Sequence, residues 1–248
     1  MQIPVNFSFR LFLVYNLPHN LYNSPQNILW FQMKKDWLQK TEEMVKNRLS
    51  FDSSGHDWWH IYRVRKLALR IADLEQANPF IVEMAALLHD ICDWKFNHGN
   101  EKAGLEVVRL FMNDIDVPSQ EQQVILEIIG SVSYKGAGIK DKMPSLEGRV
   151  VQDADRLDAL GAIGIARTFA YGGNKNQAMH EPGLEPTLHQ SFEDYKTKRS
   201  SSINHFYEKL FLLKDRLHTD SAKKIAQERH DFMVNFVDTF LQEWEGER

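Results

Sequence analysis

The amino-acid sequence predicts an all-α protein. Apolar residues recur at the three- and four-residue spacing of a helix in most of the chain, as in the run from Val64 to Leu74. No stretch shows the alternation of apolar and polar residues that is typical of paired strands. Prolines and glycines stand between the periodic stretches, where helices are expected to end.

The expected helices follow one another along the chain. From Lys34 the sequence is charged and helix-forming. The run that starts at Pro79 is so rich in apolar residues that we expect a buried helix, with the proline in its first turn. Further helices are predicted over residues 100–113, 119–133, 146–171, 187–215 and 218–245.

Residues 1–34 differ in composition from the rest of the chain. They are rich in Asn, Phe, Leu and Pro, and they contain almost no acidic residues. One interpretation is that the native protein begins at Met33 and that the preceding residues are an upstream extension. The other is that these residues form an arm that packs on the domain. We therefore expect an N-terminal extension of uncertain order over residues 1–34, a main domain over 35–215 and a C-terminal helix over 216–248 that packs on it.

The bulk composition narrows the class of protein. The net charge is −4 and the isoelectric point is near 6.2, so there is no electrostatic reason to expect nucleic acid or an anionic membrane as the partner. No apolar stretch approaches the roughly 18 to 20 residues that are needed to cross a bilayer. The single cysteine, Cys92, excludes an internal disulfide and favours a reducing, cytoplasmic location. A small anionic substrate remains compatible with this composition, and a homodimer is left open.

Four short segments contain most of the residues that could carry chemistry: residues 55–64, 87–95, 131–136 and 150–159. Two histidines in the first segment, His56 and His60, are four residues apart and would share one face of a helix. Carboxylates beside an apolar helix are costly unless they are paired or bind a metal. Two imidazoles and two carboxylates form the mixed nitrogen and oxygen ligand set that first-row divalent ions accept.

Each motif alone also allows a purely structural interpretation. His89 could cap the end of one helix and Asp90 could begin the next. His60 could be a hydrogen-bonded histidine of the core, and Asp153 could pair with Arg156. The four segments together, in this order, are much more specific than any one of them.

The ordered set resembles the HD superfamily of metal-dependent phosphohydrolases, whose pattern is a histidine, a His-Asp doublet and an aspartate on a helical bundle. In that pattern a basic and an apolar residue follow the first histidine, as Arg63 and Val64 follow His60. The metal ligands that the resemblance implies are His60, His89, Asp90 and Asp153. It further implies one divalent ion, with Mn²⁺ expected and Fe, Co, Ni, Zn or Mg as alternatives.

The resemblance also suggests a reaction. Related nucleotidases and alarmone hydrolases carry an acidic residue three positions after the aspartate of the doublet, which implies Asp93 as the general acid or base. The ligand segments look similar to a small bacterial branch of nucleotide pyrophosphohydrolases. We therefore expect release of pyrophosphate from nucleoside triphosphates. The alternatives are a nucleoside monophosphate phosphatase, a guanosine alarmone hydrolase or a non-catalytic sensor of metal or nucleotide.

Cations and hydroxyls near the ligand segments are candidates for binding the phosphates. The predicted contacts are Arg63, Lys95, Ser133, Tyr134, Lys135, Arg167 and Tyr171. For each of them the alternative is an ordinary solvated surface residue. Trp58, Trp59 and Trp94 flank the ligands, and we interpret them as core packing, with stacking on a nucleobase as the alternative.

Overall fold

The computed structural model describes residues 25–49, 57–92, 101–132, 143–187 and 200–248. Within these ranges the chain forms helices joined by loops and contains no strand, so the all-α prediction is confirmed. None of the described helices has an apolar stretch long enough to cross a membrane.

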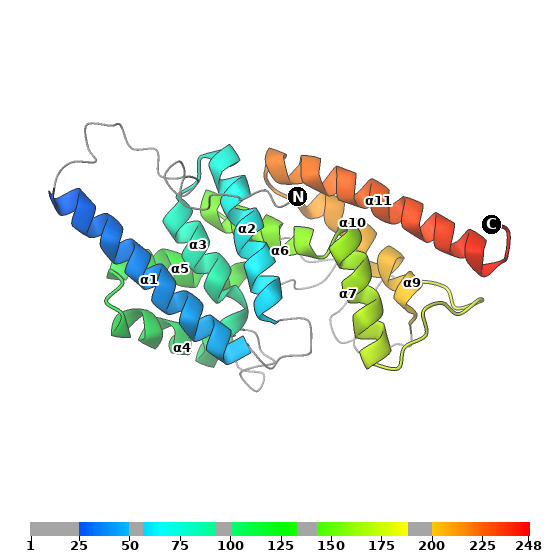
Figure 1. The fold of residues 1–248 in the computed structure, drawn as a ribbon, viewed down its shortest axis with the longest axis horizontal. Coiled ribbons are helices and arrows are strands. Elements are labelled where there is room, and N and C mark those ends of the chain that lie inside the picture. Colours follow the sequence, from blue (N-terminus) through cyan, green and yellow to red (C-terminus); the bar gives the residue numbers. More distant parts are fainter. Residues whose placement is uncertain (1–24, 50–56, 93–100, 133–142, 188–199) are drawn as a thin grey trace, which may run out of the picture.

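The helices follow the chain in one series, which Figure 1 shows in sequence colours. The elements are α1 (Pro25–Leu49), α2 (Trp58–Glu75), α3 (Pro79–Leu88), the 3-10 helix η3 (His89–Cys92), α4 (Glu101–Asp114), α5 (Ser119–Val132), α6 (Leu146–Asp158), α7 (Gly161–Asn174), α9 (Ser202–His205), the π-helix η4 (Phe206–Leu210), α10 (Phe211–Leu213), the 3-10 helix η5 (Lys214–Arg216) and α11 (Asp220–Trp244).

Several helices begin at a residue whose side-chain oxygen accepts a backbone N–H of the first turn. Asp57 caps α2, Asn78 caps α3, Ser145 caps α6 and Thr219 caps α11. Such caps satisfy donors that would otherwise lack partners inside the helix. They therefore define where the helices that carry the candidate site begin.

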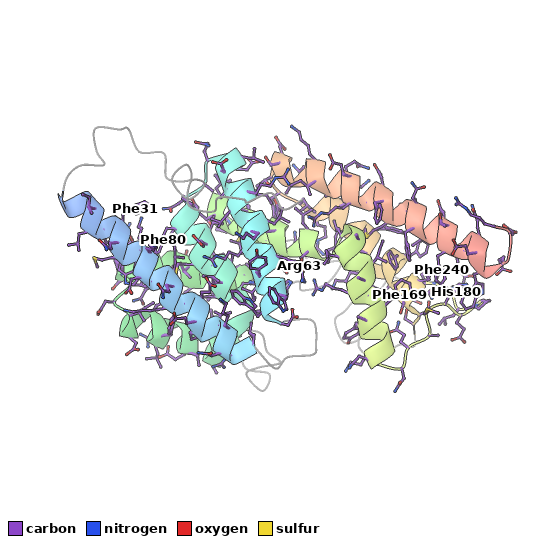
Figure 2. The ribbon with its side chains drawn as sticks, viewed as in Figure 1. Phe31, Arg63, Phe80, Phe169, His180 and Phe240 are labelled. Carbon is purple, nitrogen blue, oxygen red and sulfur yellow. The ribbon has the colours of Figure 1, made fainter. Side chains whose placement is uncertain are left out.

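The helix α3 is the centre of the core, because every residue from Phe80 to Leu88 is buried. Helices α1, α2, α5 and α6 pack around it. In Figure 1, α2 and α6 lie between a group formed by α1, α3, α4 and α5 and a second group formed by α7, α9, α10 and α11. Phe169 of α7 packs against Phe240 of α11, with ring centroids 5.9 Å apart (Figure 2). The C-terminal helix thus packs on the remainder of the chain through α6 and α7.

The structure corrects two of the predicted helices and places the start of α1 before the compositional change at Lys34. Helix α1 begins at Pro25, so the compositional change at Lys34 falls inside a helix. The helix predicted over 146–171 is two helices, α6 and α7, because Gly161 adopts a left-handed backbone conformation with φ of 73°. The helix predicted over 187–215 is a series of short helical turns from Ser202 to Arg216, and residues 188–199 lie outside the described part of the chain.

Candidate metal centre

Two histidines from different helices meet in the interior. His60 lies in the first turn of α2, where the carboxylate of Asp57 accepts the His60 backbone N–H at 2.9 Å. His89 follows the last residue of α3. Both side chains are buried, and their Nε2 atoms are 3.3 Å apart.

Each imidazole is oriented through its other nitrogen. The Nδ1–H of His60 donates to Asp158 at 2.8 Å, and the Nδ1–H of His89 donates to the carbonyl of Ala86 at 2.9 Å. This arrangement is typical of metal-binding histidines, because it turns both Nε2 atoms toward a common point. Two nitrogen ligands at about 2.1 Å from one ion would be about 3.0 to 3.4 Å apart. The observed separation of 3.3 Å therefore fits a divalent ion held by both rings.

Two carboxylates lie beside the paired imidazoles. Asp90 in η3 places its oxygens 3.4 Å from Nε2 of His60 and 3.4 Å from Nε2 of His89. Asp155 in α6 places Oδ1 3.4 Å from His60 Nε2 and 3.8 Å from His89 Nε2. Ligand atoms of His60, His89 and Asp155 all lie within 4.8 Å of one another, so the three side chains could hold one metal ion.

The predicted ligand Asp153 is not in this cluster, and Asp155 takes the expected place. The carboxylate of Asp153 is completely buried and accepts three hydrogen bonds at 2.8 Å, from the backbone N–H of His218 and from the backbone N–H and hydroxyl of Thr219. Asp153 therefore attaches α6 to the start of α11. Residues two positions apart in an α-helix are separated by about 200° of rotation, so Asp153 and Asp155 face opposite sides of α6.

A third carboxylate of α6, Asp158, joins the histidine to two arginines. Besides His60, it accepts hydrogen bonds from Nε of Arg63 at 2.7 Å, from Nη2 of Arg63 at 3.0 Å and from Nη1 of Arg167 at 2.7 Å. Burial alone would raise the pKa of Asp158, but the hydrogen bonds from His60 and Arg63 and the charge of Arg167 hold it well below its usual range. Asp158 is therefore an ionised acceptor at ordinary pH. Asp158 was not among the predicted site residues, although Asp155 and Asp158 are three residues apart and share a helix face.

The carboxylates also change the protonation of His60. Burial lowers the pKa of its imidazole, but hydrogen bonding to Asp155 and Asp158 outweighs this effect and raises the pKa to about 9. A histidine can bind a metal through Nε2 only when that nitrogen carries no proton. A divalent ion would therefore have to displace a proton from His60 below a pH of about 9.

We expect metal affinity to increase with pH. Because His60 is protonated below a pKa of about 9 and a ligand must be neutral, the apparent affinity should rise by up to about tenfold per pH unit and level off near pH 9. In the metal-free protein, the same raised pKa stabilises the fold below about pH 6.5, and this contribution is lost as the pH rises through about 9. Calorimetric titration with Mn²⁺ at several pH values would measure the first effect. An affinity that is constant between about pH 6 and about pH 9 would contradict it.

The structure describes three of the predicted substrate contacts. Arg63 and Arg167 are brought together by Asp158, and the side chain of each is about one-third exposed, at 31% and 30%. Figure 2 shows Arg63 on the side of α2 that faces α7. Tyr171 is half exposed on α7, one turn after Arg167. The predictions for Asp93, Lys95, Ser133, Tyr134 and Lys135 lie outside the described residues.

Comparison with known proteins identifies the family. The profile of the HD domain matches residues 58–160, a range that contains His60, His89, Asp90 and Asp155. The Bacillus subtilis protein YpgQ is 38% identical over 211 residues, which cover 81% of this chain and 91% of YpgQ. The chain belongs to the HD domain family.

Solved structures of family members share this fold. A HD-superfamily hydrolase of Bacillus thuringiensis is 44% identical, with a TM-score of 0.69 over 86% of this chain and 98% of that chain. YpgQ in complex with ADP is 33% identical, with a TM-score of 0.65 over 83% of this chain and 96% of that chain. This HD domain protein is thus a hydrolase of the superfamily, and the cluster of His60, His89 and Asp155 is its candidate metal site.

Proposed function

We propose that this HD domain protein hydrolyses phosphoanhydride bonds of nucleotides and releases pyrophosphate from nucleoside triphosphates, with Mn²⁺ as its metal. The observation that carries the proposal is the connection of the cluster of His60, His89, Asp90 and Asp155 to two arginines, because Asp158 accepts hydrogen bonds from His60 and from both arginines. Metal ligands and guanidinium groups next to one another are what a polyphosphate substrate requires.

The proposed division of labour follows from these contacts. His60, His89, Asp90 and Asp155 would hold the ion, which supplies Lewis-acid activation of water and of a phosphoryl group. Arg63 and Arg167 would bind the phosphate oxygens and keep the reacting phosphorus in place. Asp93, the predicted general acid or base, would transfer the proton.

Two further facts support a nucleotide as the substrate. The relative YpgQ has been crystallised in complex with ADP, and it is 38% identical to this chain. The net charge of −4 does not prevent phosphate binding, because a bound divalent ion would balance the carboxylates of Asp90 and Asp155, and the two guanidiniums outnumber the single carboxylate of Asp158.

Product analysis tests the proposal. Metal-free protein would be supplied with Mn²⁺ and offered nucleoside triphosphates, nucleoside monophosphates and guanosine alarmones in parallel. We expect a monophosphate and pyrophosphate from the triphosphates. Orthophosphate from monophosphates alone would contradict the proposal in favour of a phosphatase, and no turnover with metal bound would indicate a sensor.

The two arginines should affect substrate binding more than metal binding. Because a charge-assisted hydrogen bond contributes about 1.5 to 3 kcal/mol, Arg167→Ala should raise KM for a triphosphate about 10- to 100-fold. Arg167→Lys should recover only part of this, since lysine cannot make paired contacts to a phosphate. Arg109→Ala is the matched control, because Arg109 lies exposed on α4 and pairs with Glu106. Steady-state kinetics would measure the effect, and an unchanged KM in Arg167→Ala would remove Arg167 from the substrate site.

A further inference from the structure

Two adjacent tryptophans at the start of α2 have different surroundings. Trp58 is partly buried, packs against the core and lies beneath the ammonium of Lys46, 4.7 Å from its ring centroid. Trp59 is 61% exposed, so its interpretation as core packing was wrong. Its indole meets the ring of Tyr62 edge to face, with centroids 5.9 Å apart, and this contact restricts its orientation.

An exposed aromatic residue does not by itself indicate a binding site. The position of Trp59 relative to the candidate site residues does. Trp59 directly precedes the candidate ligand His60 and stands four residues before Arg63, so Trp59 and Arg63 lie on one face of α2, about 6 Å apart along the helix axis. Arg63 donates to Asp158, which also accepts the Nδ1–H of His60. The indole is therefore one helical turn from the candidate phosphate-binding group, on the helix that supplies His60 to the candidate metal site.

The opposite arginine has a similar setting. On α7, Ile163 and Tyr171 lie one turn before and one turn after Arg167, and both are exposed, at 43% and 49%. Arg63 and Arg167 bind the same carboxylate, and each has an exposed aromatic residue one turn away on its own helix, Trp59 on α2 and Tyr171 on α7. The two helices thus present exposed aromatic rings and guanidinium groups.

We infer that Trp59 is the residue on which the base of a bound nucleotide stacks, while Arg63 and Arg167 hold its phosphates. The inference deepens the proposed function and rests on it for the class of ligand. A ligand with a planar ring and an anionic group, separated by a sugar, matches an indole and a guanidinium one turn apart on one helix. Stacking does not depend on which base is present, so Trp59 would favour nucleotides over inorganic polyphosphates without selecting one base.

Equilibrium binding to the full-length protein loaded with Mn²⁺ tests the inference. The two probes are ADP and inorganic tripolyphosphate, which carries the charges but no ring. Trp59→Ala should raise the Kd of ADP between about 5-fold and about 150-fold, which corresponds to about 1 to 3 kcal/mol for one stacked base. The Kd of tripolyphosphate should change by less than about twofold, and Trp59→Phe should recover most of the affinity for ADP.

The matched control is Leu74→Ala, because Leu74 is 58% exposed at the far end of the same helix. It should leave both dissociation constants unchanged. Equal weakening of ADP and tripolyphosphate in Trp59→Ala, or no change in either, would overturn the inference. A changed oligomeric mass in sedimentation, with unchanged ADP affinity, would also overturn it and assign Trp59 to a subunit interface. If ADP binding depends on Trp59 but no nucleotide is hydrolysed, the inference stands and the proposed hydrolysis fails.

Discussion

Asp155→Ala should abolish metal binding and activity, whereas Asp153→Ala should retain the metal and reduce the stability of the fold. Asp155 places its carboxylate against both imidazoles, so its removal takes one ligand from the cluster. Asp153 contacts no residue of the cluster in its three recorded hydrogen bonds, which all go to the start of α11. Its removal leaves buried donors of His218 and Thr219 without this acceptor, and we expect the free energy of unfolding to fall by about 2 to 4 kcal/mol.

The two variants show which of the two aspartates binds the metal, a question that the sequence alone does not answer. Metal content after dialysis would be measured for each variant, together with unfolding by urea. Loss of the metal in Asp153→Ala at unchanged stability, with the metal retained in Asp155→Ala, would reverse the assignment. Each variant thus serves as the control for the other, since both remove one carboxylate from α6.

Asp158→Asn should weaken metal binding about 10- to 100-fold, although Asp158 is not expected to touch the ion. The substitution keeps the shape of the side chain but removes its negative charge. It also places an NH₂ group, which cannot accept a hydrogen bond, among the donors of His60, Arg63 and Arg167 that bind the carboxylate in the unaltered protein. His60 would lose the acceptor that fixes its ring, and the arginines would lose the anion between them. KM for the substrate should therefore rise as well, because Arg63 and Arg167 are no longer held in one place.

Metal titration and steady-state kinetics would separate these effects. Asp36→Asn is a suitable control, because Asp36 is an exposed residue of α1 that pairs with Lys40. Asp158→Glu restores the charge at a different distance and should recover part of the metal affinity. If Asp158→Asn binds metal as well as the unaltered protein does, the role of Asp158 in orienting His60 is wrong.

The helical class and the central part of the candidate site could be predicted from local patterns. Apolar periodicity over α2 and the dense apolar run of α3 are local properties, so both helices were expected from the sequence. The positions of His60, His89 and Asp90 follow from a motif whose members stand at the ends of those helices. The break between α6 and α7 was missed, because a single glycine inside a helical pattern does not show whether its backbone turns left-handed.

The sequence by itself determined that the chain is all-α, that it resembles the HD superfamily and that imidazoles and carboxylates would meet in it. Only the tertiary structure decided which aspartate of α6 joins the histidines. Asp153, Asp155 and Asp158 lie on one helix, and their roles depend on which neighbour each face of that helix meets: α11 for Asp153, and α2 for Asp155 and Asp158. Helix packing also explains why Trp58 packs against the core whereas the next residue, Trp59, faces solvent. Spacing along a chain gives the rotation between side chains, but the packing of the helices gives each side chain its partner.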